Sequence, residues 1–197
     1  MKLPVLSWIV CVLGLIGLVA WLGTGIVPVT KNKGGEALVG GPFSLTAPDG
    51  STVTDRDLRG KYALVYFGFT HCPDICPTSL LLMQNALDQL GAKGKKVTPV
   101  FITLDPERDT PEIVGNYVSN FGDRFVGLTG TPEQIRAAAD AYKVYYSKVE
   151  DENSALGYII DHSGFMFLMD PDGKYVTHFP HSIAEQSLTE GLDAAIR

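Results

Sequence analysis

Two cysteines separated by three residues are the part of this sequence best suited to chemistry. Cys72 and Cys76 lie in the segment THCPDICP, directly after an apolar run at residues 62–69. Pro77 suits the first turn of a helix, and a helix N-terminus lowers the pKa of a nearby thiol because it favours anions. On one helical turn, this spacing places both sulfur atoms on the same face. Such a pair can close a disulfide or bind one metal ion, whereas two unrelated buried thiols are the less favoured alternative.

Two thiolates are soft ligands that suit Cu(I) or Zn(II). A closed structural zinc site needs four protein ligands. The third cysteine of the chain, Cys11, lies inside an apolar run near the N-terminus and is expected to be a packing residue. Cu(I) accepts a low coordination number, so two sulfur atoms and one imidazole would suffice for it.

Four histidines could supply that imidazole. His71 adjoins the first cysteine of the pair, and the side chain of an adjacent residue usually points elsewhere. His178 and His181 belong to the region of a hairpin near the C-terminus and are expected to be exposed polar residues. His162 stands at the start of a core strand, after a polar loop at residues 150–157. From the residues alone, a buried, hydrogen-bonded histidine is a more natural interpretation of His162 than a metal ligand.

The elements that must position these side chains alternate between strand and helix patterns. Apolar runs at residues 62–69 and 97–104 predict buried strands of a parallel sheet. A short strand is expected at residues 125–128, and hairpins with Pro-Asp-Gly turns are expected at 43–54 and 165–179. This order predicts an α/β layered domain with a mixed central sheet flanked by helices, opened by an N-terminal β-hairpin.

Capping residues mark the expected helix starts. Residues 79–90 have helical spacing directly after the cysteine pair. Thr110 and Thr131 each precede a proline, which puts a capping hydroxyl before the first helical turn. Ser182 and Glu185 have the spacing of a capping box and predict the start of the last helix. The cysteines therefore lie between the exit of a central strand and the start of a helix, where α/β sheets build their sites.

The first thirty residues predict a membrane anchor. Residues 3–30 contain no charged side chain, and the apolar run 5–27 would rise about 34 Å as a helix, enough to cross a hydrocarbon core of roughly 30 Å. A cleaved signal peptide has a shorter apolar region and a small-x-small cleavage site, for which residues 23–25 are a poor candidate. The chain therefore divides into three expected segments: a single transmembrane helix within 1–30, a linker at 31–41 and one domain at 42–197.

Composition excludes several classes of protein. Hydrophobic residues make up 45% and charged residues 19% of the 197 residues, which excludes a disordered chain. After residue 30 the chain has 15 basic and 22 acidic residues, so the domain is acidic. No nucleic-acid partner is expected, because phosphate binding needs a basic face. Three cysteines are also too few for a disulfide scaffold.

Four motifs together resemble the Sco/SenC family, over about residues 40–197. The motifs are FGFTHCPDICP at 67–77, TLDPERDTP at 103–111, DHS at 161–163 and DPDG at 170–173. That family consists of membrane-tethered, thioredoxin-like proteins implicated in copper delivery to cytochrome c oxidase. The resemblance therefore implies a thioredoxin-like fold and a metal-binding domain held at a membrane.

The resemblance also implies a set of site residues. In the family, the two motif cysteines and the downstream histidine bind one copper, as Cu(I) or Cu(II); the matching residues here are Cys72, Cys76 and His162. Asp105 matches an acidic residue near the site, which would either tune the metal site or cap a loop. Two further acidic residues, Asp74 and Asp161, are expected to help shape the site.

Three functions fit these residues. The first is a copper chaperone that docks on the oxidase subunit bearing the copper site and passes on its metal, with the loop 150–157 moving. The second is a thiol–disulfide oxidoreductase, in which Cys72 and Cys76 keep the copper-ligand cysteines of the oxidase reduced; whether the protein is an enzyme depends on this choice. The third is a redox or copper sensor.

The expected location follows from the same resemblance. Copper traffic in this family takes place outside the cytoplasm, and the first arginine of the chain is Arg56, whereas a mitochondrial presequence would be rich in arginine. We therefore expect a single-pass protein of a bacterial inner membrane with its C-terminal domain in the periplasm. There it would meet a copper donor or a thiol reductant.

Overall fold

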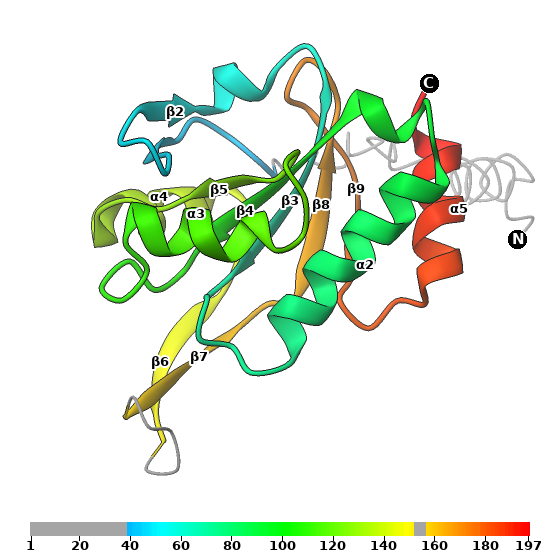
Figure 1. Ribbon diagram of the computed structural model, residues 1–197. Coiled ribbons are helices and arrows are strands. Elements are labelled where there is room, and N and C mark those ends of the chain that lie inside the picture. Colours follow the sequence, from blue (N-terminus) through cyan, green and yellow to red (C-terminus); the bar gives the residue numbers. More distant parts are fainter. Residues whose placement is uncertain (1–38, 152–156) are drawn as a thin grey trace, which may run out of the picture. The chain divides into compact units, whose positions relative to one another are not determined.

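The computed structural model describes residues 39–151 and 157–197 of the chain (Figure 1). The predicted anchor at residues 1–30 and nearly all of the predicted linker lie outside these described residues. Among the helices within them, none combines the length and the apolar character needed to cross a membrane.

A five-stranded mixed sheet forms the centre of the domain, with strand order β5-β4-β3-β8-β9. Its parallel strands are β3 (Tyr62–Gly68), β4 (Val97–Thr103) and β5 (Val126–Leu128). β8 (Phe165–Met169) runs antiparallel to β3 and forms a hairpin with β9 (Tyr175–Pro180). Every residue of β3 is buried, as an unbroken apolar sequence predicts for a strand covered on both faces. The predicted mixed sheet and closing hairpin are confirmed.

Helices cover both faces of this sheet. They are α2 (Ile75–Gln89), α3 (Pro111–Ser119), α4 (Pro132–Ala141) and α5 (Glu185–Ala195), with short 3-10 helices at η1 (Asp55–Leu58) and η2 (Gly94–Lys96). Tyr66 of β3 and Phe101 of β4 are paired on one face, where the ring of Tyr117 in α3 lies 5.3 Å from that of Phe101. Phe67 faces the other way and lies 5.3 Å from the ring of Tyr142, at the end of α4. The sheet is therefore enclosed between two layers.

Two small hairpins lie outside the main sheet. β1 (Ser44–Thr46) and β2 (Thr52–Thr54) form the predicted N-terminal hairpin. β6 (Tyr146–Glu150) and β7 (Tyr158–His162) form a second one, which the sequence analysis did not predict. In Figure 1, β6 and β7 project beyond the end of the main sheet at which β3 leads into α2. His162 therefore ends β7, instead of opening a core strand.

The β6–β7 hairpin has no strong signal of its own in the sequence. Its strand β6 is polar and largely exposed, so it lacks the apolar run that predicts a buried strand. Contacts with the loop after β4 hold it instead, including an ion pair of 2.5 Å between Lys148 Nζ and Glu107 Oε2. Its formation therefore depends on tertiary contacts.

The predicted caps of α3 and α4 are confirmed. Thr110 Oγ1 accepts a hydrogen bond from the backbone N–H of Ile113, and Thr131 Oγ1 accepts one from Gln134, each at 3.3 Å. The side chain of Gln134 in turn accepts from the backbone N–H of Thr131 at 2.8 Å, which completes a capping box. These bonds satisfy donors that the first helical turn leaves free.

The predicted capping box at the start of the last helix is wrong. α5 begins at Glu185, and its N-cap residue, Ala184, has no side-chain cap, so Ser182 lies outside the helix. The carboxylate of Glu185 has other partners: it accepts hydrogen bonds from Asn85 at 2.9 Å and Gln89 at 2.5 Å, both in α2. Glu185 therefore fastens α5 to α2, and this long-range contact replaces the local motif.

The difference between the real cap at Thr131 and the mispredicted cap at Ser182 can be measured through the free energy of unfolding. Thr131→Ala removes a real cap and is expected to lower the free energy of unfolding by about 1 kcal/mol. Ser182→Ala, at the mispredicted cap, is expected to change it by less than about 0.5 kcal/mol, as for an ordinary surface site. Urea unfolding of both variants checks this. Equal losses for the two variants would mean that Ser182 caps α5 after all.

Candidate metal centre

The cysteine pair lies where the central strand passes into the following helix. β3 ends at Gly68 and α2 begins at Ile75, earlier than the predicted 79–90, so Cys76 lies in the first helical turn. Cys72 lies in the loop before the helix, not on the same turn. The two residues contact each other nevertheless: the backbone N–H of Cys76 donates a hydrogen bond to Cys72 Sγ at 3.3 Å. Both cysteines are free thiols.

The absence of a side chain at Gly68 makes room for the buried sulfur. Cys76 is completely buried, whereas Cys72 is half-buried. A Cβ atom on Gly68 would lie 2.8 Å from Cys76 Sγ and 3.0 Å from the ring of Phe101. Only glycine at the end of β3 therefore lets this sulfur approach the strand so closely.

The two thiols differ in acidity because their side chains interact. The neighbouring Cys76 side chain, supported by hydrogen bonds from backbone N–H groups, lowers the pKa of Cys72 to about 6 against the opposing effect of burial. The same interaction raises the pKa of Cys76 far above its ordinary value, and burial raises it further. In the reduced, metal-free protein near pH 7, Cys72 is therefore the thiolate and Cys76 the thiol.

His162 faces the buried sulfur of this pair. Its Nε2 atom lies 3.9 Å from Cys76 Sγ, and its Nδ1 atom lies 3.2 Å from the backbone carbonyl oxygen of Ser163. A carbonyl only accepts, so Nδ1 carries the proton and Nε2 presents a lone pair. Burial lowers the pKa of His162, which keeps the imidazole neutral. The rings of Tyr66 and Phe69 meet it edge to face, each at 6.2 Å.

The donor set fits a soft metal ion. A metal bonded at about 2.3 Å to sulfur and about 2.0 Å to nitrogen would bridge the 3.9 Å gap between Cys76 and His162. Across residues 39–151 and 157–197, however, no three His, Cys, Asp or Glu side chains already have the spacing of a formed metal site. A side-chain movement must therefore bring Cys72 onto the same ion as the other two. Two thiolates and one imidazole suit copper.

Two of the predicted acidic residues face the same space as these donors. A hollow of about 560 Å³ opens beside Cys72 and His162, and Asp74 and Asp161 are among its lining residues. Asp151 is a third acidic residue of its lining, and exposed apolar side chains stand at Ile75, Val149 and Ile159. The site is therefore open to an approaching partner on a face that is apolar with carboxylates at its edge.

Asp105 acts on the site from a distance. Its completely buried carboxylate pairs with Arg108 and accepts a hydrogen bond of 2.8 Å from the Tyr158 hydroxyl. Arg108 also donates to the Tyr158 carbonyl at 3.2 Å and lies 3.7 Å from the centre of its ring. Tyr158 begins β7 and His162 ends it. Asp105 therefore fastens the strand that carries His162, which is more than the capping of a loop.

Asp109 is a further site residue, one not among those predicted from the sequence. Its completely buried carboxylate accepts hydrogen bonds from Thr103 Oγ1 and Thr70 Oγ1 at 2.5 Å, and from the Thr70 backbone N–H at 3.0 Å. His71 Nδ1 lies 3.5 Å from the same carboxylate. Asp109 therefore holds the segment that leads into Cys72. Its place four residues after Asp105 in one motif was the available signal.

The remaining histidines are placed differently from His162. His71 faces Asp109, in agreement with the expectation that it points away from the cysteines. His178 is exposed on β9, as predicted, and lies 2.5 Å from the Tyr175 hydroxyl through Nδ1. His181 was also expected to be exposed, but it is half-buried. Its ring packs so closely on Gly164 that a Cβ there would lie 2.4 Å away.

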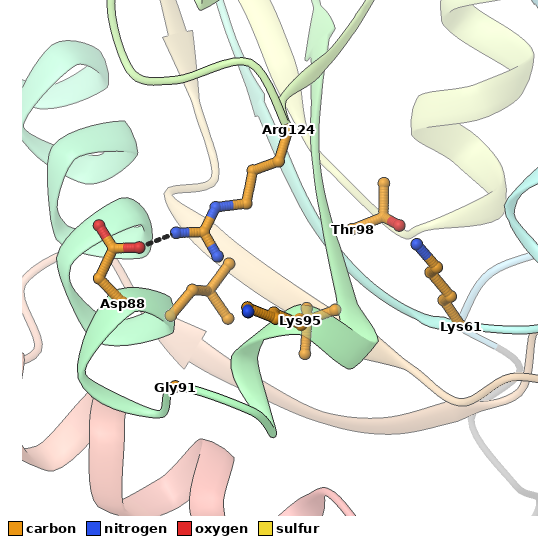
Figure 2. Close-up of a pocket in the computed structure, with 8 residues that line it drawn as sticks. Lys61, Asp88, Gly91, Lys95, Thr98 and Arg124 are labelled. Carbon is orange, nitrogen blue, oxygen red and sulfur yellow. Dashed lines mark hydrogen bonds and ion pairs between the residues drawn. The ribbon is translucent and has the colours of Figure 1, made fainter.

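A second hollow, of about 670 Å³, lies at the opposite end of the sheet, beside the first residues of β3 and β4. Figure 2 shows Lys61, Lys95 and Arg124 around it, with Arg124 paired to Asp88. Its lining residues include no cysteine or histidine, so this hollow offers no soft ligand. The metal chemistry therefore belongs to the smaller hollow beside Cys72.

The fold and the site together define a thioredoxin-like domain with a Cys-x3-Cys pair and a facing histidine. The family model described as SCO1/SenC matches residues 31–197. The chain is 47% identical over 164 residues to a mitochondrial SCO1 homolog of Arabidopsis thaliana; the match covers 83% of this chain and 48% of that relative. The chain thus spans about half the length of this relative. It belongs to the SCO1/SenC family.

Solved structures support the same assignment. The copper-bound Sco protein of Arabidopsis thaliana is 46% identical, with a TM-score of 0.75, covering 80% of this chain and 97% of that one. BsSco, described as a member of the Sco family of cytochrome c oxidase assembly proteins with a disulfide switch, is 25% identical, with a TM-score of 0.60 over 79% of this chain and 91% of that one. The predicted thioredoxin-like Sco fold is confirmed, and a relative with this fold binds copper.

The acidity of Cys72 can be measured by alkylation of the reduced, metal-free chain in detergent. Because its lowered pKa populates the thiolate above about pH 6, its alkylation rate is expected to rise with a midpoint near that pH. Cys76→Ala removes the main cause and is expected to move the midpoint upward. Peptide mass spectrometry separates Cys72 from the other cysteines. A wild-type midpoint near the ordinary value of about 8.5 would contradict this assignment.

The role of Asp109 can be tested by Asp109→Asn, which keeps the shape but turns one acceptor oxygen into a donor. Mispaired buried groups next to Thr70 and Thr103 are expected to lower the free energy of unfolding by about 1–3 kcal/mol. Asp172→Asn, at an exposed pair with Lys174, is the control and is expected to be nearly neutral. Urea unfolding gives both values. An Asp109→Asn protein as stable as wild type would show that this network does not hold the loop.

Proposed function

We propose that the protein is a copper metallochaperone that binds one copper per chain through Cys72, Cys76 and His162. It delivers this copper to the copper site of cytochrome c oxidase during assembly. The observation that carries the proposal is the 3.9 Å approach of His162 Nε2 to Cys76 Sγ, between residues 86 positions apart in the chain. A copper-bound relative and a relative described as an oxidase assembly protein support it.

The burial of the three donors suggests how copper would be released. Cys72 is half-buried at the edge of the open hollow, whereas Cys76 is completely buried. An incoming thiolate from the recipient therefore replaces Cys72 first. Copper then leaves Cys76 and His162, and the high pKa of Cys76 returns this sulfur to the thiol form. Transfer is a stepwise exchange of ligands, with copper as cargo.

The rim of the hollow suits the docking of a partner. Its apolar side chains favour contact with another protein, and the carboxylates of Asp74 and Asp161 favour a cationic edge on that partner. The partners in this proposal are the oxidase subunit that bears the copper site and a copper donor or thiol reductant. Residues 1–30 hold the chain in a bacterial inner membrane, with the domain in the periplasm.

A second function, thiol–disulfide exchange, is favoured by the asymmetric pKa values of the pair. The Cys72 thiolate would attack a disulfide of the oxidase subunit, which forms a mixed disulfide and releases one thiol of the target. Cys76, on losing its proton, would then attack the Cys72 sulfur, which forms the Cys72–Cys76 disulfide and releases the second thiol of the target. The target gains two thiols while Cys72 and Cys76 become a disulfide, so two electrons pass to the target. BsSco is described as having a disulfide switch. In this function His162 binds no metal and instead tunes the reactivity of the thiolates.

Copper binding by the reduced full chain in detergent, kept anaerobic, separates the two functions. Metal analysis with thiol titration is expected to give one tightly bound copper per wild-type chain and none for Cys72→Ser/Cys76→Ser. His162→Ala is expected to weaken binding by about 10- to 100-fold, since it removes a ligand. His178→Ala is the control, because this exposed histidine lies on β9, away from the cysteine pair.

The opposite pattern would favour the oxidoreductase. A chain that binds no tight copper but cycles readily between dithiol and disulfide contradicts the chaperone. The same holds if His162→Ala leaves copper binding intact. A ligand role predicts that this variant loses metal affinity while its disulfide still forms.

A further inference from the structure

A buried hydroxyl beside the candidate metal site has no hydrogen-bond partner among the described residues. It belongs to Tyr66, which lies in β3 and is completely buried. Buried polar groups are nearly always paired, because an unpaired one destabilises the fold. The unpaired state of Tyr66 in the metal-free protein therefore suggests that its acceptor is present only in another state.

The Tyr66 ring borders two of the three proposed ligands. Its centre lies 6.2 Å from that of the His162 ring, edge to face. A Cβ atom on Gly68, two residues along β3 on the same face, would lie 2.8 Å from Cys76 Sγ and 3.2 Å from Tyr66 Cε1. Cε1 is bonded to the carbon that carries the hydroxyl. The sulfur of Cys76 and the hydroxyl-bearing edge of Tyr66 therefore border the same small space.

The hydroxyl keeps its proton at physiological pH. A tyrosine hydroxyl has an ordinary pKa of about 10, so it is protonated near pH 7. Its polar neighbours include Cys76 and Ser79, neither of which meets hydrogen-bond geometry with it. Ser79 donates its own proton to the backbone carbonyl of Ile75 at 2.7 Å. Tyr66 is therefore a donor facing a space that the Cys76 sulfur borders.

The acceptor strength of that sulfur depends on its charge. A free cysteine is ordinarily a thiol, and the sulfur of a thiol is only a weak acceptor. A soft metal binds the thiolate, and a thiolate accepts a charge-assisted hydrogen bond, which is the stronger kind. Metal binding thus creates the acceptor that Tyr66 lacks.

We propose that Tyr66 is a positioning residue of the copper site, whose hydroxyl donates a hydrogen bond to the Cys76 sulfur once that sulfur binds copper. This inference rests on the copper-binding function proposed above. The hydrogen bond stabilises the loaded state over the empty one. It also withdraws electron density from the sulfur, which favours Cu(I) over Cu(II) and raises the reduction potential of the bound ion.

Tyr66→Phe isolates the hydroxyl, because it keeps the ring and its contact with His162. In the copper-loaded full chain, the charge-transfer band from sulfur to Cu(II) is expected to move to longer wavelength, and the reduction potential is expected to fall. Cu(I) affinity, measured by competition with a chromophoric chelator, is expected to weaken about 10- to 100-fold. The metal-free variant is expected to unfold at the same or a higher urea concentration, because an unpaired buried hydroxyl is gone.

A matched variant makes the result specific. Tyr142→Phe removes the hydroxyl of another buried tyrosine on the opposite face of the sheet, where its ring packs against Phe67. This variant is not expected to move the charge-transfer band or the potential.

Other outcomes would overturn the inference. If wild type binds copper and Tyr66→Phe has the same spectrum, potential and affinity, the hydroxyl does not contact the sulfur. A loss of metal-free stability without a spectral change would give Tyr66 a purely structural role. If Ser79→Ala shifts the spectrum as Tyr66→Phe does, Ser79 is part of the hydrogen-bond path and the direct contact is wrong. If wild type itself binds no copper, the proposed copper-binding function is wrong, and the inference about Tyr66 falls with it. Wild type that binds copper together with an unchanged Tyr66→Phe variant contradicts only the inference about Tyr66.

Discussion

The close approach of the Cys76 sulfur to the end of β3 is the constraint on which the site depends. It requires glycine at position 68, since a Cβ there would lie 2.8 Å from the sulfur. It also buries a group whose charged form is unfavourable away from water. Cys76 therefore remains a thiol until something compensates its charge, such as a bound cation and nearby donors. Because of this burial, the sulfur is a neutral thiol in the metal-free site and a thiolate when a metal ion is bound.

Two carboxylates from one loop fix the distance between the cysteines and the histidine. Asp109 holds Thr70, in the segment that leads to Cys72, whereas Asp105 holds Tyr158, in the strand that ends at His162. Both lie in the segment between β4 and α3 and are completely buried. The cysteine side and the histidine side of the site are therefore fastened to the same short segment. This explains how a hairpin outside the main sheet and a helix start can present donors within 4 Å of each other.

Local patterns explain which parts could be predicted from the sequence. The apolar run of β3, the threonine caps and the Cys-x3-Cys pair at a strand exit depend on near neighbours, and all three agree with the structure. His162 could be assigned only through the family resemblance, because its partner is 86 residues away. The β6–β7 hairpin, Asp109 and the true role of Glu185 were missed for the same reason. Each depends on contacts between segments that are separated in the sequence, and short-range sequence patterns do not predict such contacts.

The orientation of His162 bears on the choice between copper transfer and thiol exchange. In thiol exchange the attacking group is the more exposed, more acidic sulfur, Cys72, and a helpful imidazole would face it. His162 instead directs its lone pair at Cys76, the buried thiol that does not attack first. A neutral imidazole facing this buried sulfur would assist only the second step of thiol exchange, when Cys76 loses its proton, whereas it completes a set of soft donors for a metal ion. Because His162 faces Cys76 and not Cys72, its orientation favours a role as a copper ligand over a role in thiol exchange.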